Sequence, residues 1–445
     1  MRLKTTYRQI LAISIPIMLG SATQNVIALS DSVFLYHLSE TDFAAIGFVG
    51  VFYLIIASIG YSFSKGGQIL MARRYGENDF KGLGKTFFSI TYLILVLSLM
   101  MFLFMQFGTE YFFSWFIDSP QILERSLNYL EYRSWGVFFS YFGVVLVALY
   151  TGIARTSFII WDTLVLAIVN VFLNYVFIFG HFGLPAMGIA GAGLASTIAE
   201  IIAVAIFVIY ILLDKEVHKL KLFSLPAIDW QLVRNSFYIS SPIVAQAIVG
   251  LGSWFFFFSI VENLGERQLA VTNLVRIVYL ILSIPCWGYA TGINTLVSNF
   301  IGNKKRFAVI PLIWKTTKLS IASTMLIALP VLLFPQFFLY PLLGGQDPSL
   351  IAEAQPIFYV LIGILILFSS GSIYYNGMIG TGATWFGLRL QGVNAILYVL
   401  YVYLTVNVFS LSLEWAWFGE LLYWLSVFIF SALYLVSLKW HKLSF

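Results

Sequence analysis

Long apolar runs, each bounded by a short polar loop, fill most of this 445-residue sequence. A helix needs about 20 mostly apolar residues to cross a bilayer, where its backbone hydrogen bonds must be made internally. Twelve runs reach that length, near residues 10–36, 46–70, 86–108, 130–152, 158–180, 187–213, 236–261, 269–298, 308–340, 356–379, 386–409 and 415–438. The sequence therefore predicts an all-α membrane protein with twelve transmembrane helices.

Composition supports this class, because 60% of the residues are hydrophobic and 10% are charged. Soluble domains carry about 25% charged residues. The net charge of +5 lies in loops between the apolar runs, so it does not predict a nucleic-acid partner. The single cysteine, Cys286, allows no disulfide within the chain, and the four histidines show no metal-ligand spacing. The first run is too long for a signal peptide and is read as a retained span.

The loop charges predict an orientation. If the N-terminus is cytoplasmic and the spans alternate, 21 of the 25 Lys and Arg residues fall on the cytoplasmic side. The other four, Arg125, Arg133, Arg267 and Arg276, fall outside or in the outer parts of spans. This bias satisfies the positive-inside rule. We therefore expect a multi-pass protein of the plasma (inner) membrane with both termini in the cytoplasm.

The two halves of the sequence form an internal repeat. A shift of 226 residues places Pro16 on Pro242 and the segment 53–55 on 279–281, both of which read Tyr-Leu-Ile. Six spans separate equivalent elements, so the halves share one orientation and are parallel repeats. We expect two pseudo-symmetric six-helix lobes around a central cavity, with the N-terminal lobe at 1–213, a cytoplasmic connector at 214–234 and the C-terminal lobe at 235–445.

One carboxylate, Asp31, lies inside the first apolar run, about two helical turns from its outer end. Inserting an ionisable group there costs at least about 2.5 kcal/mol, so a functional role is the default interpretation. The alternative is a structural aspartate that hydrogen-bonds a neighbouring helix.

Several motifs, taken in order, resemble the multidrug and toxic compound extrusion (MATE) family of cation-coupled antiporters, and the likeness covers essentially the whole chain. No single motif is highly specific. The motifs are the Pro16 to Asp31 span, GGQILMARRYGEND (66–79), YTGIARTSF (150–158), the pair Asn170 and Asn174, GIAGAGLAST (188–197) and ATGINTLVSNFIGNKKRF (290–307).

The resemblance implies a cation or proton site in the N-terminal lobe. It is built on Asp31 and completed by Asn170, Asn174 and Ser196. Positions 170 and 174 project from one helix face, and carboxylate, amide and hydroxyl oxygens suit either Na⁺ or a protonatable aspartate. Asp31, Asn170 and Asn174 are thus the expected Na⁺ ligands, and no cofactor besides the coupling ion is implied. The alternative for the two asparagines is a structural role, in which they hydrogen-bond neighbouring helices.

This chain departs from relatives that carry further acids. Gly250 and Ser369 occupy the positions of the acids in the seventh and tenth spans, and Asn174 that of a second acid in the fifth. The departure favours coupling through the N-terminal lobe and leaves Na⁺ and H⁺ open.

Four further residues are candidates for the substrate cavity or for helix bending: Pro16, Gln24, Glu200 and Gln246. Pro16 bends its helix in the simplest interpretation, and packing is the alternative for Gln24. Glu200 and Glu420 occupy equivalent places in the repeat, where they act either in transport or as a structural pair.

The function expected from the resemblance is export of lipophilic, often cationic, small molecules by alternating access, driven by H⁺ or Na⁺. The expected partners are this substrate and membrane lipid, and the expected state is a monomer. A lipid-linked saccharide flippase of the same superfamily is the alternative, but such proteins tend to have fourteen spans. An integral-membrane enzyme is less favoured because no catalytic grouping is visible, and a channel lacks a filter-like sequence.

Overall fold

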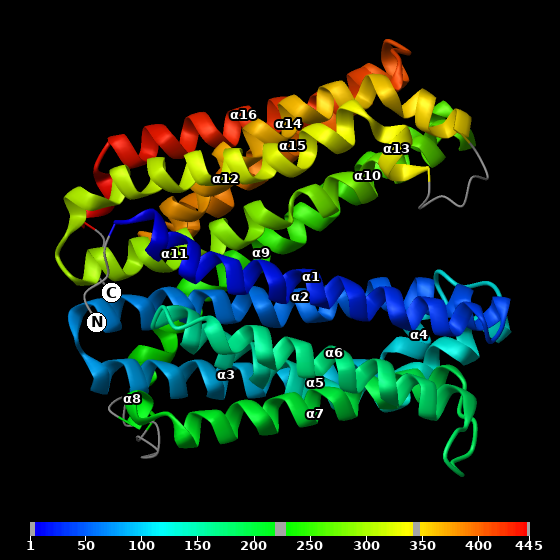
Figure 1. Cartoon of the computed structure of the whole chain (residues 1–445), viewed down its shortest axis with the longest axis horizontal. Coiled ribbons are helices and arrows are strands. Elements are labelled where there is room, and N and C mark those ends of the chain that lie inside the picture. The colour runs from blue at the N-terminus through cyan, green and yellow to red at the C-terminus, as the bar shows by residue number, and fades with distance from the viewer. Residues whose placement is uncertain (1–4, 219–227, 341–347, 443–445) are drawn as a thin grey trace. The chain divides into compact units, whose positions relative to one another are not determined.

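The computed structural model describes residues 5–218, 228–340 and 348–442, and every regular element in these ranges is helical (Figure 1). The first half of the chain forms α1 (Tyr7–Tyr36), α2 (Glu40–Glu77), α3 (Phe80–Phe107), α4 (Thr109–Phe113), α5 (Pro120–Gly152), α6 (Ser157–Phe179), α7 (Ile189–Leu213) and α8 (Lys215–His218). The second half forms α9 (Trp230–Val261), α10 (Glu266–Leu282), α11 (Ile284–Gly302), α12 (Val309–Leu333), α13 (Pro335–Leu339), α14 (Pro348–Gly380), α15 (Thr384–Tyr403) and α16 (Leu413–Val436).

The predicted all-α membrane fold is confirmed. Ten helices in the described ranges are long and apolar enough to cross a membrane, and α10 with α11 makes one more as a bent pair. The first predicted run is α1, a helix of 30 residues. Each of the twelve predicted runs therefore corresponds to one long helix or to one bent pair, and the run 308–340 also contains the short helix α13.

The second-half run 269–298 is not one straight helix. It is divided into α10 and α11, which are bent by 46°. Pro285 lies in the first turn of α11. Proline has no backbone N–H to donate to the preceding turn, which explains why the helix restarts there. The run 386–409 likewise ends in a short π-helix, Leu404–Val408.

The chain divides into two compact units, which differ from the predicted lobes at their edges. One unit contains Leu19–Val244 and the other Met1–Met18 with Ala245–Phe445. Both boundaries fall inside helices, α1 and α9, so each of these helices begins in one unit and ends in the other. The predicted limits of the repeats, at 213 and 235, stay a prediction, since repeat and compact unit are different divisions of the chain.

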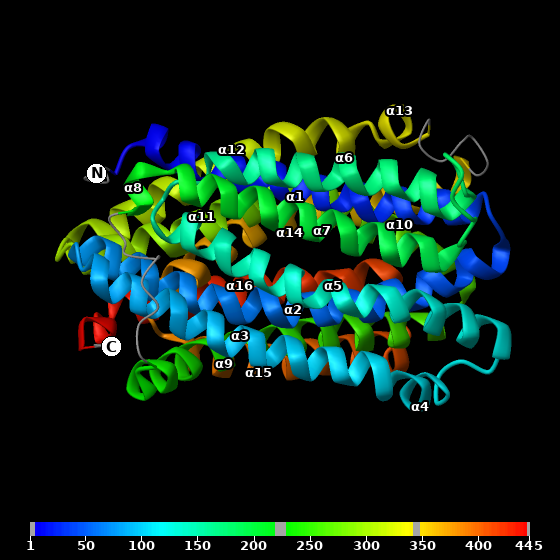
Figure 2. The ribbon, with the colours of Figure 1, turned by 90° about the horizontal axis from the view of Figure 1, so that it is seen from below.

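In the unit 19–244, α5 packs against α2, α3 and α7, and α6 packs against α7 (Figures 1 and 2). The small-residue run of α7 makes this approach close. A Cβ on Gly193 would lie 2.5 Å from the Tyr129 carbonyl oxygen of α5, and one on Gly191 would lie 2.7 Å from the backbone of Phe177 in α6. Small residues at such contacts are typical of helix packing in membranes.

In the other unit, α14 packs against α10, α11, α12 and α16. Here too glycine allows close contact, since a Cβ on Gly380 would lie 2.5 Å from the Asn294 carbonyl oxygen of α11. The start of α1 belongs to this unit, and Gly292 of α11 leaves room for the Ser14 hydroxyl.

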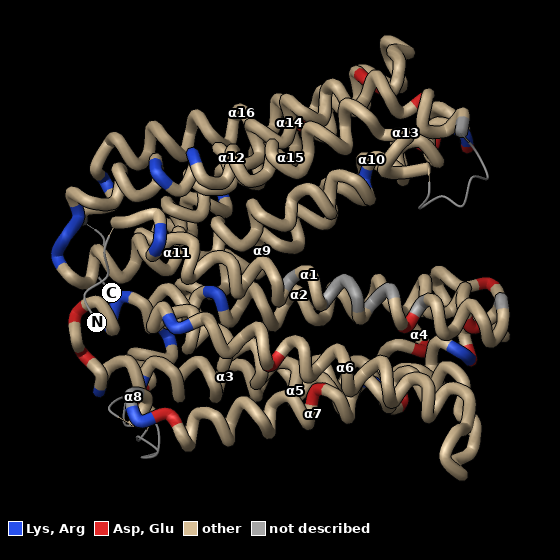
Figure 3. The backbone as a smooth tube through the Cα atoms, in the orientation of Figure 1, with Lys and Arg blue, Asp and Glu red and all other residues tan. Residues whose placement is uncertain are grey.

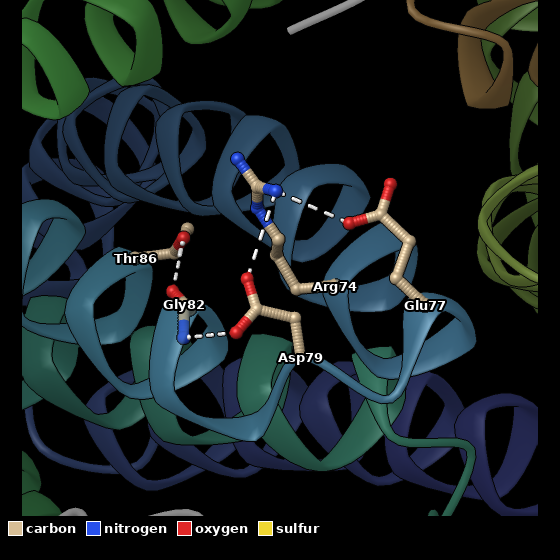
Figure 4. Close-up of polar contacts among 5 residues, drawn as sticks. All are labelled: Arg74, Glu77, Asp79, Gly82 and Thr86. Carbon is tan, nitrogen blue, oxygen red and sulfur yellow. Dashed lines mark hydrogen bonds and ion pairs between the residues drawn. The ribbon is translucent and has the colours of Figure 1, made fainter.

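The turn between α2 and α3 shows how the polar loops are built (Figure 4). Asn78 ends α2 in the left-handed conformation, with φ 59°, and Asp79 caps α3 by accepting a 2.8 Å bond from the Gly82 N–H. Arg74 forms ion pairs with Glu77 at 3.1 Å and with Asp79 at 3.7 Å. The same left-handed turn recurs 226 residues later at Lys304, with φ 57°, as the internal repeat predicts.

Basic residues collect at connections between helices, as Figure 3 shows along the backbone tube. In the unit 19–244, Arg73, Arg74, Lys81, Arg155 and Lys215 lie at or beside the connections α2–α3, α5–α6 and α7–α8, which share one end of that unit, whereas Arg125 and Arg133 lie within α5. In the other unit they include the three consecutive basic residues between α11 and α12.

Candidate cation site in the first half

Asp31 lies on the part of α1 that belongs to the unit 19–244, and its side chain is 8% exposed. The side-chain amide of Asn174, on α6, donates to Asp31 Oδ1 at 2.5 Å. Among the described residues, Asp31 has no salt bridge with a basic side chain. The first contact of this carboxyl group is therefore a neutral amide.

The hydrogen bonds continue across three helices. Asn174 Nδ2 also donates to Asn170 Oδ1 at 3.3 Å, and Asn170 Nδ2 donates to Ser196 Oγ of α7 at 2.9 Å. The i, i+4 spacing places both amides on one face of α6, as the sequence predicts. The structure thus brings all four predicted residues of the cation site together, and their role in ion binding stays a prediction.

One atom in this chain of contacts has no partner. Asn174 Oδ1 is buried and makes no hydrogen bond within the described structure. An unsatisfied buried acceptor costs about 1–3 kcal/mol. A carboxylate beside amide and hydroxyl oxygens is a donor set that fits a hard monovalent cation or a proton. No cluster of three His, Cys, Asp or Glu side chains exists in the described part of the chain, so a divalent metal centre has no such ligand group there.

Glu200, a predicted cavity residue, lies one helical turn beyond Ser196 on α7 and is held in an ion pair. Arg133 of α5 donates to both carboxylate oxygens, at 2.5 and 2.7 Å. The side chains of Arg133 and Glu200 are 7% and 14% exposed, and the guanidinium lies 3.8 Å from the ring centroid of Tyr53. This contact provides Glu200 with a structural partner.

Gly136 provides the space for this pair. A Cβ at Gly136 would lie 2.2 Å from Arg133 Nη1 and 2.7 Å from Glu200 Oε2. Any larger residue would have to displace the guanidinium. The pair was not predicted, because the loop-charge rule assigned Arg133 to the outer side. An arginine inside the apolar run 130–152 was the available signal, since such residues almost always pair within the protein.

Two of the other candidates, Pro16 and Gln246, belong to the other compact unit. Pro16 is buried inside α1, which stays helical across it, on the part that belongs to the other unit. The side chain of Gln24 falls outside the described residues. Gln246 is 6% exposed and donates to the Thr384 carbonyl oxygen at 2.9 Å, while Gln391 donates to the backbone of Gln246. Gln246 therefore ties α9 to α15.

Two polar features of this unit were not predicted. Asp162 of α6 lies within a predicted span, and its Oδ1 is buried with no hydrogen bond among the described residues. At the polar end of the same unit, Asp214 accepts from Arg155 at 2.6 Å and from the Tyr150 hydroxyl at 3.1 Å. The position of Asp162 inside a predicted span was a signal that could have identified it. Nothing in the sequence indicates that Asp214 contacts Tyr150 and Arg155.

An all-helical membrane protein with two similar halves and a carboxylate inside a span has the features of a secondary transporter. A family model described as MatE matches residues 16–176 and 242–404. The chain therefore belongs to the MatE family, the multidrug and toxic compound extrusion family that the motifs resemble. The two matches begin 226 residues apart, which is the shift of the internal repeat. Membership places the chain among transporters and not among enzymes.

Known proteins agree with this assignment. A probable multidrug resistance protein NorM of Thermotoga maritima is 23% identical over 444 residues, which cover 98% of this chain and 93% of that protein. Its counterpart in Agrobacterium fabrum is 24% identical over 274 residues, and the match covers 58% of that protein. A solved structure described as the outward-facing conformation of a multidrug resistance MATE family transporter of the MOP superfamily has a TM-score of 0.87. It is 18% identical and covers 97% of this chain and 96% of its own.

Proposed function

We propose that this protein is a cation-coupled antiporter that exports lipophilic, often cationic, small molecules by alternating access. The observation that carries the proposal is the buried hydrogen-bond chain from Asp31 through Asn174 and Asn170 to Ser196. Under the proposal the coupling ion, H⁺ or Na⁺, binds at Asp31. The protein acts as a monomer in the plasma (inner) membrane, and no cofactor takes part.

The amide of Asn174 suits both ions. In the described arrangement its N–H group faces the carboxylate, which satisfies Asp31 in the absence of a cation. Rotation of the same amide would direct its unpartnered oxygen toward a Na⁺ ion at Asp31, or toward the O–H of a protonated Asp31. Binding of either ion would break the hydrogen bond from the Asn174 amide to Asp31 Oδ1. Ion binding would therefore rearrange the contacts of α1 with α6.

Coupling requires the ion and the substrate to prefer different conformations, because a ligand that binds both states equally shifts neither. Helix α1 passes from one compact unit to the other between Met18 and Leu19. Asp31 and Pro16 lie on opposite sides of that boundary. A change in the contacts of Asp31 would thus reach the other unit along one helix, and Pro16, which cannot donate to the preceding turn, is the position where bending costs least.

The orientation in the proposal follows from the charges of the connections. The basic connections α2–α3, α5–α6 and α7–α8 share one end of their unit, and the positive-inside rule assigns such an end to the cytoplasm. Both termini are then cytoplasmic. Asp31, on the later part of α1, lies in the outer half of the membrane, where an ion from outside has access to it.

The test is transport by the purified protein in liposomes, with a fluorescent lipophilic cation such as ethidium and with H⁺ and Na⁺ gradients imposed separately. We expect gradient-driven flux in the wild type and its loss in Asp31→Asn. Glu353→Gln is the matched control, because Glu353 is an exposed acid paired with Arg267 and lies outside the proposed site. Full ion-driven flux in Asp31→Asn would overturn the assignment of the coupling site, and no flux with either gradient in the wild type would overturn the function.

A further inference from the structure

The second half of the chain contains a buried carboxyl group that the proposed site does not use. Glu420 of α16 is 4% exposed. Trp424 Nε1 donates to Glu420 Oε1 at 3.0 Å, and the hydroxyl of Tyr279, on α10, donates to the same oxygen at 3.3 Å. The side chain of Tyr398 on α15 also lies near this carboxyl group. Three neutral groups from three helices thus surround it.

The internal repeat shows which basic side chain is missing beside Glu420. Glu420 is the counterpart of Glu200, and Tyr279 is the counterpart of Tyr53. In the first half Arg133 neutralises Glu200 and lies over the Tyr53 ring. The shift of 225 that aligns Tyr150-Thr151-Gly152 with Tyr375-Asn376-Gly377 puts Phe358 in the place of Arg133, and Phe358 is fully buried in an apolar cluster. The second half has kept the acid and the tyrosine without the base.

No charged neighbour replaces that arginine in the described part of the chain. The titratable groups that face Glu420 are Tyr279 of α10, Tyr398 of α15 and Tyr423 of α16 itself, with Cys286 of α11 beyond Tyr279. These groups are neutral at their ordinary pKa values near physiological pH. The charged residues of the helices around Glu420 are Glu266, Arg267 and Arg276 of α10, Glu353 of α14, Arg389 of α15 and Glu414 of α16, with Lys439 beyond α16. Arg276 lies in the middle of α10, with its guanidinium 5.2 Å from the Phe258 ring centroid, and none of these described residues forms a salt bridge with Glu420.

The donors around Glu420 also indicate which ligand it takes. An indole N–H can only donate, so Trp424 directs a positive hydrogen at Oε1, which makes this oxygen a poor metal ligand. The described neighbours supply aromatic rings and donors instead of a shell of carbonyl or carboxylate oxygens. A proton needs no such shell. Protonation removes the charge of a carboxyl group that would otherwise be buried without a cation.

We propose that Glu420, held by Tyr279 and Trp424, is a second proton-binding site of this protein, separate from Asp31 and located in the other compact unit. The proposal rests on the proposed cation-coupled transport. The proton comes from water and returns to water: Glu420 takes it up as a carboxylate and releases it from the neutral acid. Because the carboxyl group is almost fully buried in this conformation, exchange with water requires another conformation. Proton binding at Glu420 therefore depends on the conformational state, as coupling requires.

The first experiment detects the protonated carboxyl group directly. Infrared difference spectra between acid and alkaline buffer are recorded on the full-length protein in liposomes, for the wild type, Glu420→Gln, Asp31→Asn and the control Glu353→Gln. We expect a carboxylic-acid C=O band that persists in Asp31→Asn and Glu353→Gln and disappears in Glu420→Gln. Identical bands in Glu420→Gln and the wild type would overturn the proposal.

A conservative variant keeps the test decisive if Glu420→Gln does not fold. Tyr279→Phe retains the carboxyl group and removes one hydrogen-bond donor, so the same band should shift in frequency. An unshifted band would show that the titrating group lies elsewhere. If Glu420 is only structural, the bands of the other carboxyl groups remain, and no band is lost in Glu420→Gln or shifted in Tyr279→Phe.

The second experiment counts protons. In liposomes that carry out proton-driven export, the number of protons moved per substrate should fall by one in Glu420→Gln and stay unchanged in Glu353→Gln. An unchanged ratio in Glu420→Gln would overturn the role of Glu420 in coupling. Absence of proton-driven transport in the wild type would instead count against the proposed function, while the infrared band would still report whether Glu420 binds a proton.

Discussion

The ion pair between Arg133 and Glu200 makes a quantitative prediction about stability. Both side chains are largely buried, at 7% and 14% exposure, and the pair is bidentate. At an effective dielectric constant of about 20 and a charge separation of about 4 Å, the Coulomb attraction is about 4 kcal/mol. Removing one partner of a buried pair typically costs about 3–5 kcal/mol, because the remaining charge loses its compensation. We expect a loss of this size in the free energy of unfolding for Arg133→Met.

The pair must be tested as a double-mutant cycle. Arg133→Met with Glu200→Gln removes both charges and leaves residues of similar volume, so we expect this double variant to recover most of the stability that Arg133→Met loses. Unfolding by increasing mole fraction of sodium dodecyl sulfate in mixed micelles, followed by circular dichroism, measures each free energy.

The chain provides a matched control for this cycle. Arg267 and Glu353 also form a bidentate pair, but both side chains are 42% exposed. Exposed pairs contribute about 0–1 kcal/mol, so the same substitutions there should have small effects. Equal coupling energies at the two pairs would refute the reasoning, and so would a double variant that is as unstable as Arg133→Met alone.

Two smaller stability predictions use the same unfolding assay. Gly136→Ala should destabilise the protein by about 1–3 kcal/mol, the usual cost of overpacking, because the new Cβ would lie 2.2 Å from Arg133 Nη1. An unchanged stability would show that the pair moves without cost. Lys304→Gly should stabilise it by up to about 1 kcal/mol, because Lys304 has a φ of 57° and glycine adopts this conformation without strain. Asn78→Gly at the equivalent turn should change the stability less, because asparagine tolerates this conformation; a larger gain there would contradict the explanation.

Much of the fold could be predicted because the bilayer restricts what an apolar run can form. Each of the twelve runs became a helix or a bent pair, and the family model matches two segments separated by the predicted shift of 226. The bends and ends of these helices were less predictable. The bend before Pro285 and the π-helix at Leu404–Val408 depend on local backbone chemistry that hydropathy does not measure.

The candidate site, too, could be predicted only in part. Asp31, Asn170, Asn174 and Ser196 lie together as predicted, because the cost of a carboxylate in a span and the i, i+4 spacing are both local properties of the sequence. The partner of Glu200 was not predicted, since Arg133 is 67 residues away and the loop-charge rule assigns charges to sides of the membrane without pairing them. Contacts between helices depend on packing, which a single sequence does not reveal.

The positions where the two halves differ explain why a repeat can yield two unlike sites. The counterpart of Asp31 is Phe257, which is buried among aromatic rings, so the first-half site has no second copy. The counterpart of Arg133 is Phe358, so Glu420 lacks the base that holds Glu200.

Each half thus retains a buried carboxyl group without a salt bridge among the described residues, Asp31 in one and Glu420 in the other, at positions the repeat does not relate. This asymmetry leads to a last prediction: Phe358→Arg should give Glu420 the partner that Glu200 has. In that variant the infrared band assigned to Glu420 should be lost, because a paired carboxylate stays ionised. Persistence of the band in a folded Phe358→Arg protein would show that the repeat does not place residue 358 where Arg133 lies.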